Sequence, residues 1–321
     1  MKKEIIDLRT ALEALEGIPG QLIQTDVEVD PFAELCGVYR HVGAGGTVMR
    51  PTKLGPAMIF NNIKGHPGAR VAIGVLASRE RIGHLLNYDY KKLGFLLKDA
   101  VSKAIAPVTV PQAQAKCQEV VYKATDEGFD IRKLVPAPTN TPEDAGPYVT
   151  LGMAYASDPE TGESDVTIHR LCLQGKDEIS MYFVPGARHL GVFREKAEAA
   201  GKPLPISISI GVDPAIEIAS CFEPPTTPLG FDELDIAGAI RGKAVELVDC
   251  VTVGAKAIAN AEYVIEGELL PGVRCVEDQN TGTGKAMPEF PGYTGPANPS
   301  LPIIKVKAVT KRKNPIMQTC I

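Results

Sequence analysis

Apolar and polar residues alternate along much of the second half of the chain, and this period of two predicts half-buried β-strands. Ile206, Ile208 and Ile210 alternate with serines. Near the end of the chain, Lys305 and Lys307 alternate with apolar residues, so both lysines are expected to point outward. Further apolar runs lie at 147–157, 165–175, 179–186, 244–253 and 262–270. Many strands with short turns predict a barrel, because closure removes exposed sheet edges.

The first part of the chain shows a different pattern. Leu8, Leu12 and Leu15 recur at helical spacing before Gly17. Two apolar runs separated by His-Pro-Gly then predict a pair of strands, and spaced leucines over 79–103 predict helices.

A proline-rich stretch over 106–147 follows, with little apolar content, so neighbouring elements must hold it in place. One further helix is predicted at 189–201. The predicted fold class is α+β, with an N-terminal mixed α/β domain over 1–105 and a β-barrel domain over 106–321.

Composition excludes several classes of protein. The net charge is -5 and the basic residues are scattered, which argues against a nucleic-acid partner. No apolar stretch approaches the roughly 20 residues that span a bilayer, and the acidic N-terminal helix does not resemble a secretion signal. We therefore expect a cytoplasmic protein without a membrane contact. The seven cysteines form no CxxC pair, which favours reduced thiols over disulfides or a zinc site.

Two features carry candidate chemistry. His169 and Arg170 lie inside an apolar strand, so one of the two should face inward, and a buried arginine needs a carboxylate or phosphate partner. A purely structural ion pair is the alternative. The glycine-rich loop 274–293 contains Glu277 and Glu289 and is either a functional loop or a solvated hairpin.

Several longer motifs occur together in this chain. They are DVTIHRLCLQG at 165–175, PLPISISIGVDPA at 203–215, FDELDIAGAIRGKAVELV at 231–248, MPEFPGYTG at 287–295 and KAVTKRKNPI at 307–316. In this order they resemble the UbiD family of decarboxylases. The resemblance covers essentially the whole chain and is strongest to bacterial members that act on gallate, protocatechuate or 4-hydroxybenzoate.

The resemblance implies an FMN-binding split β-barrel that carries prenylated FMN. It also implies that Mn²⁺ (or Mg²⁺), together with K⁺, holds the cofactor phosphate. The implied metal ligands are Asp165, His189 and Glu233. Oxygen and imidazole ligands suit these metals. Asp165 stands where the family commonly has Asn, so either the metal offsets the added charge or Asp165 is not a ligand. A lone histidine such as His189 is otherwise typical of a helix start or a core.

The family's catalytic set is Glu–Arg–Glu. The arginine corresponds to Arg170 and the last glutamate to Glu289. The first glutamate usually lies five residues before the last, where this chain has Gly284. If residues 279–285 are a short insertion, Glu277 takes the place of that first glutamate. Glu289 is the expected acid that protonates the ring carbon after carbon dioxide leaves. The residues expected to contact the cofactor are Thr167, Ile168, His169, Arg170, His189 and Glu233.

The implied reaction is the non-oxidative decarboxylation of a hydroxylated aromatic acid, and the residues do not identify which hydroxybenzoate. A flavin prenyltransferase would supply the cofactor, and the full-length protein would be a homo-oligomer. Family members are longer, and the chain stops directly after a strand, so a C-terminal domain is expected to be missing. A non-catalytic fragment that binds prenylated FMN and metal, or a split-barrel flavin reductase, are the alternatives.

Overall fold

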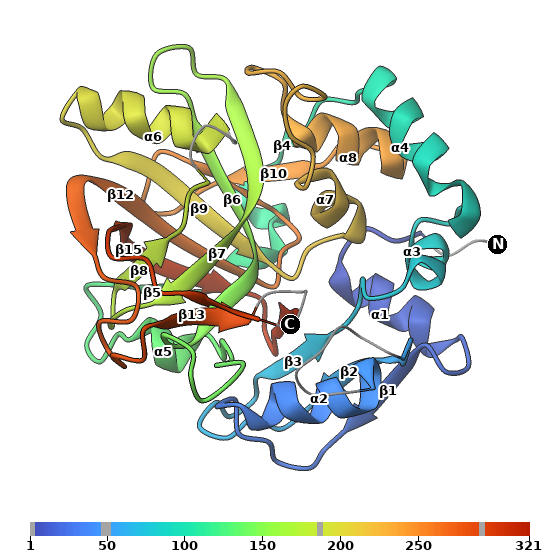
Figure 1. Cartoon of the computed structure of the whole chain (residues 1–321). Coiled ribbons are helices and arrows are strands. Elements are labelled where there is room, and N and C mark those ends of the chain that lie inside the picture. Colours follow the sequence, from blue (N-terminus) through green and yellow to red (C-terminus); the bar gives the residue numbers. More distant parts are fainter. Residues whose placement is uncertain (1–3, 46–52, 185–188, 289–292) are drawn as a thin grey trace.

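A closed antiparallel barrel forms the centre of the second half of the chain (Figure 1). The computed structural model describes residues 4–45, 53–184, 189–288 and 293–321. The barrel order is β12-β9-β6-β7-β8-β15, and β15 pairs back with β12. Its strands are β6 (Tyr148–Ser157), β7 (Ser164–Leu173), β8 (Glu178–Met181), β9 (Leu204–Ile210), β12 (Tyr263–Cys275) and β15 (Leu301–Lys311), and β5 (Val120–Lys123) pairs with β15. The predicted α+β class with a barrel is confirmed.

The alternation in β9 gives a strand that is buried on both faces. Its isoleucines enter the main core, as predicted. The prediction of a half-buried strand is wrong for Ser207 and Ser209, which are also buried. The reason is that β11 (Lys256–Ile258) covers them, and each serine hydroxyl bonds to its backbone, at 2.6 Å from Ser207 Oγ to Lys256 O. In β15, Lys305 and Lys307 point outward and form ion pairs with acidic residues, as predicted.

A smaller four-stranded sheet combines three strands from the N-terminal part of the chain with the last described strand. Its order is β1-β2-β3-β16, and β3 and β16 run parallel. The strands are β1 (Leu22–Thr25), β2 (Ala57–Phe60), β3 (Arg70–Ile73) and β16 (Ile316–Thr319). The helices α1 (Leu8–Glu16) and α3 (Arg79–Leu85) share an apolar cluster with one face of the sheet, and α2 (Glu34–Ala44) contacts the other face. The last strand therefore belongs to this sheet, and a domain boundary near residue 105 stays a prediction.

Buried charges join the two parts of the molecule. Arg9 of α1 donates to Glu262 beside β12 at 2.7 Å, and Arg312 after β15 donates to Asp7 at 2.8 Å. Glu262 also accepts the backbone N–H of Ile316 at the start of β16. Because these groups are paired with one another, their burial is tolerated.

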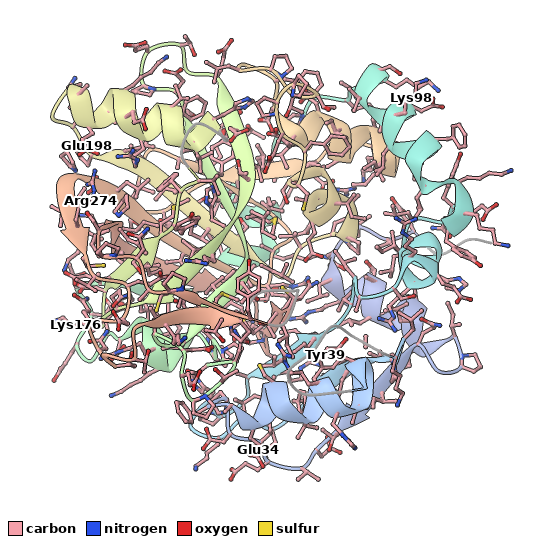
Figure 2. All side chains as sticks on the ribbon, viewed as in Figure 1. Glu34, Tyr39, Lys98, Lys176, Glu198 and Arg274 are labelled. Atoms are coloured by element: carbon pink, nitrogen blue, oxygen red, sulfur yellow. The ribbon has the colours of Figure 1, made fainter. Side chains whose placement is uncertain are left out.

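Helices cover the barrel on two sides. α6 (His189–Ala199) packs along β12, and Figure 2 shows Glu198 of α6 pointing to Arg274 of β12, with a distance of 2.8 Å between Glu198 Oε1 and Arg274 Nη2. A second core lies between the barrel and a layer that includes α7 and α8. The remaining elements are η1 (Tyr90–Lys92), α4 (Leu93–Ser102), β4 (Val108–Thr109), η2 (Gln112–Gln114), η3 (Lys116–Gln118), α5 (Ile131–Leu134), α7 (Pro214–Ala219), α8 (Glu233–Arg241), β10 (Glu246–Asp249), β13 (Lys285–Pro288) and β14 (Thr294–Pro296). Among the described helices, none combines the length and apolarity that membrane crossing requires.

Candidate metal and cofactor site

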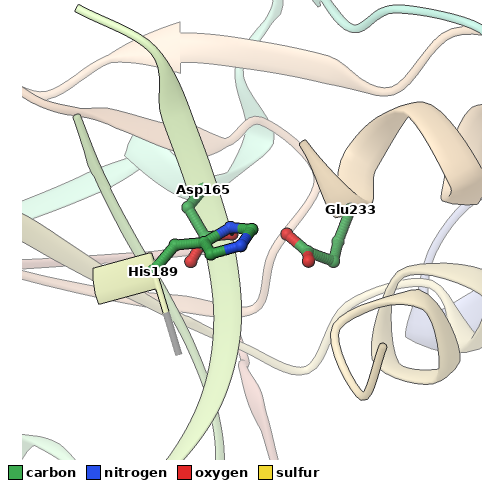
Figure 3. A group of neighbouring side chains, drawn as sticks. All are labelled: Asp165, His189 and Glu233. Atoms are coloured by element: carbon green, nitrogen blue, oxygen red, sulfur yellow. The ribbon is translucent and has the colours of Figure 1, made fainter. Parts of the chain in front are cut away.

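Three side chains that are far apart in sequence meet beside the start of β7. Asp165 lies on β7, His189 is the first described residue of α6, and Glu233 is the first residue of α8 (Figure 3). One possible ligand atom from each lies within 4.8 Å of the other two, and all three residues are buried. The structure thus brings together the three predicted metal ligands.

Local hydrogen bonds orient two of these residues. Thr167 donates its hydroxyl proton to Asp165 Oδ2 at 2.6 Å, and His189 Nδ1 lies 3.2 Å from Asp165 Oδ1. Glu233 opens α8 directly after Asp232, whose side chain accepts the N–H of Leu234 and caps the helix. A helix N-terminus favours a carboxylate, which helps to hold Glu233 at this position.

Burial and the contacts within the cluster shift the pKa values of all three side chains. Burial, and then the neighbouring Asp165 carboxylate, raise the pKa of Glu233 far above its ordinary value. Burial opposes ionisation of Asp165, but hydrogen bonds with His189, Glu233 and Thr167 hold its pKa below the ordinary value. The hydrogen bond with Asp165 raises the pKa of His189. A cation placed between these groups would satisfy both carboxylates.

Two buried atoms of the cluster have no hydrogen-bond partner among the described residues. They are His189 Nε2 and Glu233 Oε2. Buried polar atoms are normally satisfied, so these two are free to act as ligands. One imidazole and two carboxylates form a donor set that suits Mn²⁺ or Mg²⁺. The residues present therefore fit a divalent metal.

Arg170 and Glu277 form the second part of the site. Arg170 Nη2 lies 3.3 Å from Glu277 Oε2, and the guanidinium lies 4.4 Å from the centre of the Tyr182 ring. Glu277 is almost fully buried, whereas Arg170 keeps a fifth of its side chain exposed. The structure thus places the Glu277 carboxylate against Arg170, and the catalytic role of both residues stays a prediction.

Residues outside the predicted set fix the position of Glu277. Tyr148 donates its hydroxyl proton to Glu277 Oε1 at 2.9 Å, and the backbone N–H of Asn298 donates to Oε2 at 3.0 Å. Gln174 donates to the backbone carbonyl of Glu277 at 2.7 Å. No local pattern indicates these partners, because Tyr148 and Glu277 are 129 residues apart in sequence.

The other predicted contact residues lie between these two groups on β7. Thr167 and His169 are buried and Ile168 is half-buried. His169 Nδ1 lies 3.0 Å from the carbonyl oxygen of Tyr182, and its ring centre lies 5.2 Å from that of Phe183. Glu289 lies outside the described residues.

The fold and the site define an α+β protein with a closed antiparallel β-barrel and a candidate divalent-metal centre. The family model of the 3-octaprenyl-4-hydroxybenzoate carboxy-lyase Rift-related domain matches residues 108–321, and that of the N-terminal domain of the same carboxy-lyase matches residues 13–100. The chain belongs to the UbiD family of carboxy-lyases.

Individual relatives agree with this assignment. Gallate decarboxylase from Lactiplantibacillus plantarum is 59% identical over 321 residues, which are 100% of this chain and 66% of that protein. The apo structure of a 3,4-dihydroxybenzoic acid decarboxylase from Enterobacter cloacae is 61% identical, with a TM-score of 0.94 over 99% of this chain and 65% of that one. An evolved dimeric UbiD-class enzyme from Pelotomaculum thermopropionicum, solved with prenylated FMN, is 36% identical, with a TM-score of 0.86 over 98% of this chain and 67% of that one. This chain thus spans about two thirds of the length of these relatives.

Proposed function

We propose that this chain is the cofactor-binding and metal-binding part of a decarboxylase that removes carbon dioxide from a hydroxylated aromatic acid with the help of prenylated FMN. The main observation is the placement of two charged groups on one strand. Asp165 and Arg170 are five residues apart on β7, which corresponds to roughly 17 Å along a strand. A mononucleotide with its phosphate near the first residue and its ring near the second would fit this spacing.

Asp165, His189 and Glu233 would hold Mn²⁺ or Mg²⁺, and K⁺ would assist in binding the phosphate. The two atoms without partners, His189 Nε2 and Glu233 Oε2, support this role. When bound, prenylated FMN supplies the electron sink that an aromatic carboxylate needs in order to lose carbon dioxide. Thr167, Ile168 and His169 would line the cofactor between its phosphate and its ring.

Arg170, Glu277 and Glu289 would act at the reacting end. Arg170 is held by Glu277 and by the Tyr182 ring, so its guanidinium is oriented before the substrate arrives. Glu289 would donate the proton to the ring carbon from which carbon dioxide has departed. The names of the relatives, which act on gallate and on 3,4-dihydroxybenzoate, support a hydroxylated benzoate as the substrate.

Partners follow from the same proposal. A flavin prenyltransferase would supply the cofactor, the full-length protein would form a homo-oligomer, and the reaction would take place in the cytoplasm. Neither nucleic acid nor membrane is needed as a partner.

The test is to co-express the chain with a flavin prenyltransferase and to record the absorbance and mass of the bound cofactor. The proposal predicts bound prenylated FMN and conversion of 3,4-dihydroxybenzoate, gallate or 4-hydroxybenzoate to the corresponding phenol. Bound cofactor without any carbon dioxide release from these acids would instead identify a non-catalytic fragment. Hydride transfer from NADH to the flavin would identify a reductase.

A further inference from the structure

The loop that follows β12 carries Glu277 and is tied back to the barrel by one asparagine. Within the loop the Asp278 carboxylate accepts the backbone N–H of Gly284 at 2.7 Å, so residues 278–284 form a closed turn. Most of this turn is exposed to solvent. The side-chain amide of Asn280 is different, because it bonds to the residue at the end of β7.

That residue is Gln174, which directly follows the last residue of β7. Asn280 Nδ2 lies 2.8 Å from the carbonyl oxygen of Gln174 and 3.1 Å from its Oε1. At the other end of the same side chain, Gln174 Nε2 donates to the carbonyl oxygen of Glu277 at 2.7 Å and to the Ser180 hydroxyl at 2.9 Å. The side chain of Gln174 is therefore bonded at both ends, in a residue that is only 4% exposed.

The direction of these bonds fixes the orientation of the Gln174 amide. A side-chain amide has an oxygen that only accepts and a nitrogen that only donates. Because Asn280 Nδ2 is a donor, it holds Gln174 Oε1 on its own side and leaves Nε2 to face Glu277. The opposite orientation would place Oε1 against the carbonyl oxygen of Glu277, where neither acceptor has a proton to share. Asn280 thus selects the orientation in which Gln174 holds Glu277.

Gln174 also relates Glu277 to Arg170. Arg170 lies four residues before Gln174 and faces the same side of the strand, because side chains two and four residues apart share a face. Arg170 Nη2 contacts the Glu277 carboxylate at 3.3 Å, and Gln174 holds the Glu277 backbone. The side chain and the main chain of Glu277 are therefore attached to one stretch of β-structure.

We propose that Asn280 is a positioning residue for the decarboxylase site: it orients the Gln174 amide, which in turn holds Glu277 against the Arg170 guanidinium. This inference rests on the proposed function, because it gives Asn280 a part in the reaction assigned to Arg170 and Glu277. Asn280 acts through Gln174 and makes no contact of its own with the reacting groups.

The first test needs no cofactor and follows amide hydrogen exchange at Glu277, whose N–H donates to the carbonyl oxygen of Asn298. Asn280→Ala removes the donor and should speed this exchange about fivefold, which is the effect of one ordinary hydrogen bond. Asn280→Asp places a carboxylate against two acceptors of Gln174, so it should speed the exchange more than alanine does. Equal exchange in the parent and in both variants would overturn the inference.

Two further variants separate positioning from a general loosening of the loop. Thr283→Ala is the matched control, because the Thr283 hydroxyl bonds to neighbouring residues of the same loop, and it should leave the exchange unchanged. Gln174→Met keeps the length of the side chain without its donors, and Asn280→Ala should have no further effect in this background. Additive effects would show that Asn280 does not act through Gln174. If Gln174→Met does not fold, the order of the two Asn280 variants decides.

The second test uses the chain loaded with prenylated FMN and measures the conversion of 3,4-dihydroxybenzoate. Asn280→Ala is expected to lower kcat about fivefold with KM and the amount of bound cofactor unchanged, because only the alignment of Arg170 and Glu277 is disturbed. An unchanged kcat beside faster exchange would overturn the positioning role and leave Asn280 a purely structural residue. A parent that releases no carbon dioxide would reject the proposed function, whereas the exchange pattern still decides whether Asn280 holds Glu277.

Discussion

Replacing Tyr148 with Phe tests whether Glu277 is held in place as the structure indicates. Tyr148 is fully buried, and its hydroxyl donates to Glu277 Oε1 at 2.9 Å. Burial, together with nearby Cys172 and Glu277, raises the pKa of Tyr148, so the phenol stays protonated and acts as a donor. Tyr148→Phe keeps the ring and removes this donor from a buried carboxylate. A hydrogen bond to a charged group contributes about 1.5–3 kcal/mol, and we expect a loss of this size in the free energy of unfolding.

Tyr263→Phe is the matched control. Tyr263 is also fully buried, but its hydroxyl has no hydrogen-bond partner among the described residues. Its removal should therefore change stability by less than about 0.5 kcal/mol or increase it, because an unsatisfied polar group is costly to bury. Urea denaturation of both variants and the parent gives the comparison. Equal losses in the two variants would refute the reasoning, since only one of them breaks a hydrogen bond.

Three further predictions concern other buried ionisable side chains. Burial raises the pKa of Glu217 from 4.5 to about 8. Between these pH values the folded state keeps a proton that the unfolded state releases. The free energy of unfolding therefore falls as the pH rises from 4.5 to about 8. Glu217→Gln should remove this dependence and stabilise the protein by about 3 kcal/mol at pH 7, as measured by denaturation across pH 5–8. Glu262→Gln should destabilise it by about 1.5–3 kcal/mol in the same assay, because Arg9 and Arg312 lose their ion pairs with Glu262 while Arg312 keeps its pair with Asp7. Adding Mn²⁺ should raise the melting temperature of the parent and leave that of His189→Ala unchanged; an equal shift in both would exclude the proposed ligand set.

The barrel was predictable because alternation is a local property of each strand. The covering of Ser207 and Ser209 was not, since it depends on β11, which lies almost fifty residues away in sequence. The pairing of β16 with β3 in the N-terminal sheet could not be predicted either, because a short apolar run does not specify its partner strand.

The candidate site, like the fold, could be predicted from the sequence only in part. The resemblance named Asp165, His189 and Glu233, and the fold brings them together, although no spacing in the sequence would have paired them. Glu277 required an assumed insertion, and its contact with Arg170 agrees with that alignment. The support from Tyr148 was missed, because a buried tyrosine in a strand is indistinguishable from a core residue until its partner is known.

The most direct test of the proposed function uses 3,4-dihydroxybenzoate labelled with ¹³C in its carboxyl group. The chain, loaded with prenylated FMN and Mn²⁺ in cells that express a flavin prenyltransferase, is mixed with the labelled acid, and the released gas is measured by mass spectrometry. We predict labelled carbon dioxide together with an equal amount of catechol, and loss of both products in Glu289→Gln with the cofactor still bound. A chain that carries the cofactor and releases no labelled carbon dioxide from this acid, from gallate or from 4-hydroxybenzoate would contradict the assignment of decarboxylase activity to this chain.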